Sequence, residues 1–157
     1  PFGLYIVNSV QEEIGLRGAE MIVERLRPNV AIVTDVCHDT TAPLYSKISS
    51  GDQAAGKGPV LTYGASVHKK LLDLILATAQ KQEIPFQRAA ASRTTGTDTD
   101  AFAYSNGGVP SALISLPLKY MHTTVETASK SDIEQVIELM YAFLVDFDPS
   151  FDFRYIS

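Results

Sequence analysis

Two adjacent glutamates, Glu12 and Glu13, follow an apolar run near the start of the chain and precede two glycines. The apolar run, residues 4–7, predicts a buried strand. Neighbouring negative charges at the end of a buried strand are costly unless a cation faces them, and α/β proteins place ligands where a strand opens into a glycine-rich turn. We therefore predict a metal centre, with Glu13 as a ligand and Glu12 as a base acting on metal-bound water. The alternative is a solvated turn, the commonest setting of two adjacent glutamates.

The composition excludes several classes of function. A chain of 157 residues with 45% hydrophobic and 20% charged residues is typical of one soluble globular domain. The net charge of −5 and the absence of a basic cluster argue against nucleic-acid binding. No apolar run approaches the ~18 residues of a membrane span. Cys37 is the only cysteine, which excludes an intrachain disulfide and predicts a cytoplasmic location.

The first part of the sequence predicts a parallel strand pair. Apolar residues at helical spacing over residues 19–26 predict a helix that Pro28 ends, and residues 30–33 predict a second buried strand ending on Thr34 and Asp35. A strand–helix–strand unit places both strand ends at the same edge of a sheet. Asp35 would therefore join Glu12 and Glu13 there.

The remaining pattern predicts an α/β fold, a three-layer α/β/α sandwich with a mostly parallel sheet and helices on both faces. Residues 36–59 predict a long irregular loop, which is usually functional or mobile in a compact domain. The expected strands are residues 60–63, 86–91 and 110–116. The first expected helix is residues 66–83, capped by Ser66, with a buried stripe of Val67, Leu71, Leu72, Leu74, Ile75 and Ala79. Two more helices are expected, residues 101–106 and a last helix from near Ser131 with a core stripe of Ile133, Val136, Ile137, Met140 and Leu144. A final strand in the tail, residues 146–157, stays open.

His122 lies in the loop after the last expected strand and completes the set of candidates. Carboxylates and imidazole together suit zinc, with cobalt or manganese as alternatives. A hydrogen-bonding surface imidazole is the alternative interpretation of His122. Other polar residues receive structural interpretations: a second-shell or structural role for His38, solvation for His68, capping and loop ordering for Asp98 and Asp100, and packing for Cys37.

Five motifs, in this order, resemble one family of di-metal peptidases, the glutamyl, lysyl and deblocking aminopeptidases, which include tetrahedral self-compartmentalising enzymes and members labelled endoglucanase or cellulase. The motifs are QEEIGLRGA at 11–19, DVCH at 35–38, GTD at 96–98, GVP at 108–110 and PLKYMHTTVE at 117–126. The resemblance covers nearly the whole chain, and the set in its order is specific although each motif alone is weak.

The resemblance implies a role for each candidate. Glu12 is expected to be the general base, Glu13 and His122 to bind one metal ion, and Asp35 to bind the other, in a centre of two divalent ions that releases N-terminal residues from peptide substrates. The family's remaining His and bridging Asp precede the Glu-Glu motif and do not occur before Glu12 here. The resemblance therefore implies that residues 1–157 are a single partial catalytic domain, its C-terminal half, without the family's inserted dimerisation domain.

Several alternatives stay open at this point. The chain is expected to have as partners the missing half of its domain and further copies of itself, yet it could also be an inactive fragment or a non-catalytic remnant. A glycoside hydrolase is disfavoured, because adjacent glutamates are poorly placed on opposite faces of a sugar ring and the chain has no Trp to stack on sugars. The missing half could also be supplied by a separate chain.

Overall fold

A mixed sheet forms the middle layer of the protein in the computed structural model, which describes residues 1–43 and 45–155. Within these residues the strand order is β1-β4-β2-β3, with β5 paired to β4. The strands are β1 (Ala31–His38), β2 (Val60–Tyr63), β3 (Gln87–Ala90), β4 (Ser111–Lys119) and β5 (Thr127–Ala128). The helices are α1 (Arg17–Leu26), α2 (Lys47–Ser50), α3 (Lys69–Lys81), α4 (Asp98–Ala103) and α5 (Lys130–Asp146).

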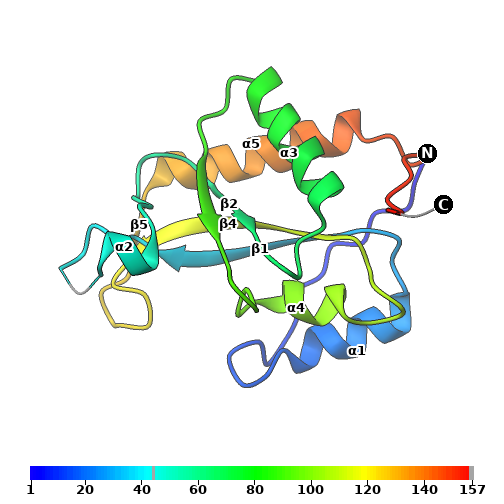
Figure 1. Ribbon diagram of the computed structural model, residues 1–157, viewed down its shortest axis with the longest axis horizontal. Helices are drawn as coiled ribbons and strands as arrows, with labels where there is room; N and C mark the ends of the chain where they lie inside the picture. Colours follow the sequence, from blue (N-terminus) through cyan, green and yellow to red (C-terminus); the bar gives the residue numbers. More distant parts are fainter. Residues whose placement is uncertain (44, 156–157) are drawn as a thin grey trace.

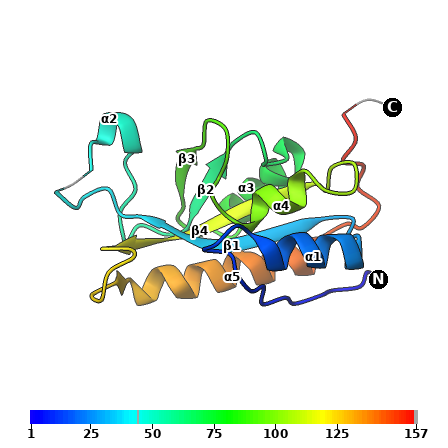
Figure 2. The same cartoon turned by 90° about the horizontal axis from the view of Figure 1, so that it is seen from below.

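Helices cover both faces of the sheet (Figure 1), and α2 lies at the end of the molecule away from the N-terminus (Figure 2). α1 and α4 pack together on one face, where α4 contacts β1 and β4, and α3 and α5 pack together on the other. The strand pairs β1–β4 and β2–β3 are parallel, whereas β4 runs antiparallel to β2 and β5. The predicted three-layer α/β/α architecture is confirmed, with a mixed sheet in which the two longer ladders, β1–β4 and β2–β3, are parallel.

The core lies between β4, β2, α3 and α5. Ala112, Leu113 and Ile114 of β4 are at most 3% exposed, as expected for a central strand covered on both faces. The apolar stripe predicted for the helix over residues 66–83 is confirmed in α3, where Leu71, Leu72, Ile75 and Ala79 are fully buried. The expected strands at residues 60–63, 86–91 and 110–116 correspond to β2, β3 and β4.

The core face of α5 differs from the prediction. Leu139 and Phe143 are buried, whereas Ile133 and Ile137 are 41% and 62% exposed. Val136, Met140 and Leu144 pack against the core as predicted. Apolar residues surround much of this helix, so their spacing alone does not define one buried face. Packing against α3 and the aromatic residues Phe147 and Phe153 selects the face.

The strand predicted at residues 4–7 is wrong. These residues belong to no strand, and Leu4, Tyr5, Ile6 and Val7 are all exposed, Ile6 by 92%. β1 instead pairs in parallel with β4, in a register that runs from Ala31 opposite Ser111 to His38 opposite Leu118. An apolar run becomes a strand only where a partner supplies the ladder of hydrogen bonds, and the local pattern does not identify that partner.

Several element boundaries also differ from the prediction. β1 continues past Asp35 to His38, which shortens the irregular loop expected over residues 36–59, and α2 lies inside that loop. Ser66 does not cap α3, which begins at Lys69, because its hydroxyl donates to Asp100 instead. α4 begins at Asp98 because the Thr97 side chain accepts from the Thr99 N–H. The last helix begins at Lys130, one residue before the predicted start.

The tail after α5 contains no strand in residues 147–155, and residues 156–157 of the predicted tail segment lie outside the described residues. His68 is not solvated as expected, because its ring stacks on Tyr155 with the centroids 4.6 Å apart. None of the helices in the part of the chain described here is long and apolar enough to cross a membrane.

Candidate active site

The turn that carries Glu12 and Glu13 is folded by its own backbone. The N–H groups of Gly15 and Leu16 both donate to the Glu12 carbonyl oxygen at 3.1 Å, and Gly18 N–H donates to the Val10 carbonyl at 2.9 Å. A Cβ at Gly18 would lie 2.3 Å from that Val10 oxygen, so only glycine allows this approach. The glycines after the two glutamates therefore bring the start of α1 against the turn.

Asp35 and His122 reach the same edge of the sheet through the β1–β4 pair. Asp35 lies opposite Ser115 in the parallel register, and His122 follows the end of β4 at Lys119. The imidazole Nδ1 of His122 lies 3.8 Å from Oε1 of Glu13, although these residues come from opposite ends of the chain. His122 and Glu13 therefore come together as the family resemblance implies, although residues 4–7 form no strand and Asp35 lies within β1, three residues before its end.

The charges at this edge act on one another. Burial raises the pKa of Glu12, and the negative charges of Asp35, Glu13 and Asp98 raise it further, against the opposing effect of His122. Burial also raises the pKa of Asp35; the Val36 N–H, 2.7 Å from Oδ1, opposes this, while Asp98 and Glu13 add to it. Carboxylates that raise one another's pKa are stabilised as anions when a cation binds among them.

Asp98 also belongs to this edge, although the sequence pattern predicted only a capping or loop-ordering role for it. The Ser9 hydroxyl donates to its Oδ2, and its Oδ1 is buried without a hydrogen-bond partner among the described residues. The one signal for it in the sequence was the GTD motif at 96–98. Asp100 does order its loop as expected, because it accepts hydrogen bonds from Thr95 and Gly96.

The side chains at this edge have the chemistry of divalent-metal ligands. Carboxylate and imidazole donors suit zinc, cobalt and manganese, and the buried Oδ1 of Asp98 has no donor within residues 1–43 and 45–155. Among the described residues, however, no group of three Asp, Glu, His or Cys side chains is arranged to hold a metal ion. The donor set fits a divalent metal in its chemistry, and it does not form a closed coordination shell.

Cys37 and His38 lie near Asp35 on β1, and each has its own local environment. The Tyr45 hydroxyl lies 2.8 Å from His38 Nδ1, and burial and then the charge of His122 lower the pKa of His38. Burial raises the pKa of Cys37 to about 12, and the charges of Asp35 and Asp39 act in the same direction. Cys37 is therefore a packed thiol, as predicted, and not a nucleophile.

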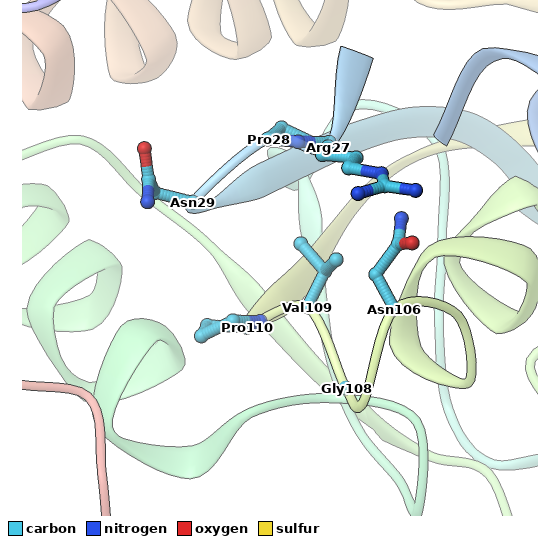
Figure 3. Close-up of a pocket in the computed structure, with 7 residues that line it drawn as sticks. All are labelled: Arg27, Pro28, Asn29, Asn106, Gly108, Val109 and Pro110. Carbon is cyan, nitrogen blue, oxygen red and sulfur yellow. The ribbon is translucent and has the colours of Figure 1, made fainter. Parts of the chain in front are cut away.

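A cavity of about 470 Å³ lies away from these residues (Figure 3). Its lining comes from the segments that precede β1 and β4: Arg27, Pro28, Asn29, Asn106, Gly108, Val109 and Pro110. Since β1 and β4 are parallel, this cavity is at the end of the sheet opposite His122. Arg27 is its only titratable residue, so the cavity offers no acid or base for catalysis.

Known proteins resemble this chain in sequence. The family model for M42 glutamyl aminopeptidase matches residues 1–139. The chain is 39% identical over 146 residues to a lysyl aminopeptidase from Pyrococcus furiosus, covering 93% of this chain and 41% of that protein. The chain therefore spans about two fifths of the length of that relative.

Solved structures share the fold. The TET aminopeptidase from the marine sediment archaeon Thaumarchaeota archaeon SCGC AB-539-E09 superimposes with a TM-score of 0.82 at 30% identity, over 90% of this chain and 40% of that one. The TET1 peptidase from Pyrococcus horikoshii, described as assembling into a tetrahedron or a large octahedral shell, gives 0.70 at 28% identity, over 88% and 40%.

A Thermotoga maritima protein described as an endoglucanase gives a TM-score of 0.59 at 26% identity, over 79% of this chain and 36% of that one. The predicted resemblance, including the endoglucanase label of some members, is confirmed. The match over residues 1–139 shows that the chain belongs to the M42 glutamyl aminopeptidase family.

Proposed function

We propose that this chain supplies part of the catalytic centre of a co-catalytic metallo-aminopeptidase that releases N-terminal residues from peptides. In this proposal residues 1–157 are a single partial catalytic domain, and further ligands come from outside them. The observation that carries the proposal is the meeting of Glu12, Glu13, Asp35 and His122 at one edge of the sheet. These residues come from three separate segments, and Glu13 and His122 approach to 3.8 Å.

The family resemblance implies a role for each residue. Glu13 and His122 would hold one divalent ion and Asp35 the other, with zinc favoured and cobalt or manganese as alternatives. When bound, such a pair of ions supplies a more acidic water and polarises the scissile carbonyl. Glu12 then takes a proton from the attacking water and returns it to the leaving amine nitrogen.

The electrostatics support Glu12 as the base. Its pKa is raised by burial and by the surrounding carboxylates, which makes it a stronger base than an exposed glutamate. Cations bound by Glu13, His122 and Asp35 would lower that pKa again and keep Glu12 ionised at neutral pH. The four residues would therefore act as one charge-balanced unit that needs its cations to work.

Metal binding tests the proposal most directly. Zinc per chain would be measured by elemental analysis after dialysis against trace zinc, on the wild type and on Glu13→Ala/His122→Ala. We expect about one or two ions in the wild type and a loss in the double variant. Glu134→Ala/His68→Ala, with circular dichroism as a check of folding, is a matched control that removes one Glu and one His elsewhere.

Two outcomes would count against the proposal. A wild-type chain without zinc would favour the inactive-remnant alternative, and equal zinc in both double variants would mean that the bound ions are not at this edge. If zinc binds, Glu12→Gln should keep the metal and abolish peptidase activity, since it removes the base but no ligand. Activity would be measured on short unblocked peptides, with and without the remaining part of the domain added in trans.

The assembly and location of the protein belong to the same proposal. We propose a homo-oligomer, supported by the shells described for the Pyrococcus horikoshii relative, and a reducing compartment such as the cytoplasm, supported by the single cysteine. The glycosidase alternative has the endoglucanase name of one structural relative in its favour. Chelator-resistant hydrolysis of a soluble cellulose derivative would revive it.

A further inference from the structure

The loop that carries His122 has an unusual backbone. It joins β4 to β5, and within it Tyr120 and His122 have φ angles of 59° and 63°. Residues with a side chain rarely adopt this left-handed region, and they remain there only when surrounding contacts hold them. His122 is a candidate ligand, so whatever holds its backbone also decides where its imidazole points.

The contacts that hold the loop come from its own residues. The N–H of His122 donates to Oε1 of Glu126 at 2.5 Å. At the start of the loop, the Thr123 hydroxyl and N–H donate to the Tyr120 carbonyl oxygen at 2.6 and 3.1 Å. Glu126 is itself fixed by the next residue, because Thr127 pairs with Lys119 across the antiparallel β4–β5 ladder.

Glu126 therefore touches the backbone of His122 and not its ring. The imidazole instead faces Glu13, with Nδ1 3.8 Å from Oε1. A short hydrogen bond from a backbone N–H to a charged carboxylate is stronger than one between neutral groups. It is the only side-chain hydrogen bond to His122 among the described residues.

We propose that Glu126 is a positioning residue that holds His122 in the left-handed conformation in which its imidazole faces Glu13. The proposal deepens the proposed function, since it rests on His122 being a metal ligand. Its first consequence is nevertheless independent of metal: in the zinc-free chain, Glu126 alone protects the His122 amide. Its second consequence is that loss of Glu126 weakens zinc binding only when His122 is present.

The test compares Glu126→Ala with Glu126→Gln, whose side-chain oxygen can still accept from the His122 N–H. Glu134→Ala is the matched control, because Glu134 is an exposed glutamate on α5 paired with Lys130 at 3.5 Å. In the zinc-free 157-residue chain, NMR would record the chemical shift and hydrogen exchange of the His122 amide. We expect a changed shift and faster exchange in Glu126→Ala, and values near the wild type in Glu126→Gln and Glu134→Ala.

Zinc affinity, measured by competition with a chromophoric chelator, gives the second readout. Partners that orient a metal ligand typically contribute 10–100-fold to affinity, so we expect about a tenfold loss in Glu126→Ala and recovery in Glu126→Gln. In the His122→Ala background, Glu126→Ala should cause no further loss. A merely structural role for Glu126 would weaken binding equally in both backgrounds.

The outcomes separate this proposal from the proposed function. An unchanged His122 amide in Glu126→Ala would overturn the positioning role, whatever the chain does with zinc. An equal loss of zinc affinity in the presence and absence of His122 would overturn it as well. A wild-type chain that binds no zinc would refute the proposed function, while the amide measurement would still decide whether Glu126 sets the conformation of His122.

Discussion

Two sets of carboxylates in this molecule have opposite electrostatic behaviour. At the candidate site, burial and neighbouring negative charges raise the pKa of Glu12 and Asp35. Under the adjoining loops, the pKa values of Asp39 and Asp100 are lowered, because hydrogen bonds to each carboxylate outweigh the opposing effect of burial. Both pairs consist of acidic residues close to the sheet, so residue type does not explain the difference.

The two sets differ in the hydrogen-bond donors that the protein provides to each carboxylate. Asp39, 1% exposed, accepts hydrogen bonds from the Thr41 N–H, the Thr41 hydroxyl and the Ala55 N–H at 2.7, 2.5 and 3.0 Å. Asp132, fully buried, likewise accepts from the N–H groups of Gly56 and Gly58 at 2.6 and 2.9 Å. Hydrogen bonds from the protein itself satisfy these buried carboxylates, and each carboxylate holds a loop in place.

The carboxylates at the site edge have fewer such donors and more like-charged neighbours. Asp35 accepts one backbone hydrogen bond, from Val36, while it interacts with the charges of Asp98 and Glu13. A buried acid surrounded by N–H and O–H groups therefore stabilises the fold. Acids that repel one another would instead be stabilised by a cation from outside, which is what we propose for this edge.

Asp39→Ala should have the largest effect on stability. The substitution leaves the N–H groups of Thr41 and Ala55 without their acceptor, and hydrogen bonds to a charged group contribute about 1.5–3 kcal/mol each. We expect the free energy of unfolding in urea at neutral pH to fall by about 3 kcal/mol. A loss as small as that of an exposed control, Asp73→Ala, would show that Asp39 is not a structural acid.

The pH dependence of stability should distinguish the two sets of carboxylates, with the second-largest effect. A group whose pKa is lowered in the folded state stabilises the fold above its unfolded pKa and loses that contribution as the pH falls through its folded value. Asp39 and Asp100 therefore stabilise the fold at neutral pH and lose this effect below about pH 4. Unfolding followed at several pH values should show a shallower acid loss in Asp100→Asn than in the wild type. Parallel curves would contradict the contribution of Asp100.

Asp35→Asn should have the smallest effect, and it should be stabilising. A group whose pKa is raised in the folded state favours folding at low pH, and this contribution is lost as the pH rises through the folded value. Removing the charge of Asp35 should therefore stabilise the zinc-free chain at neutral pH by less than about 1 kcal/mol. Thermal unfolding with and without zinc would check it: zinc should reverse the order and favour the wild type. Destabilisation of the zinc-free chain would contradict an unfavourable charge at Asp35.

Much of the fold follows from local patterns in the sequence. The three-layer architecture, the α3 stripe and the strands β2, β3 and β4 were all predicted from spacing and from the residues that end each element. These features depend on near neighbours in the chain, which the sequence presents directly. Two residues of the α5 stripe, Ile133 and Ile137, and the strand expected at residues 4–7 were wrong, because apolar residues there do not specify which element packs against them.

The candidate site was likewise predicted only in part. The sequence singled out Glu12, Glu13, Asp35 and His122 by residue type, by their positions after apolar runs, and by family resemblance. It missed Asp98 as a member of the edge, because an Asp at the start of a short helix has the same local pattern whether it caps the helix or faces a site. It also gave no sign that Glu126 contacts the backbone of His122.

The chemistry of the candidate side chains and the glycines of the turn after Glu13 follow from the sequence, since these depend on residue type and local conformation. The pairing of β1 with β4 and the approach of His122 to Glu13 come instead from the tertiary structure. The tertiary structure also determines which acids accept hydrogen bonds from the protein and which repel one another. Strand partners, burial and charge interactions all depend on groups far apart in the chain, and folding alone brings those groups together.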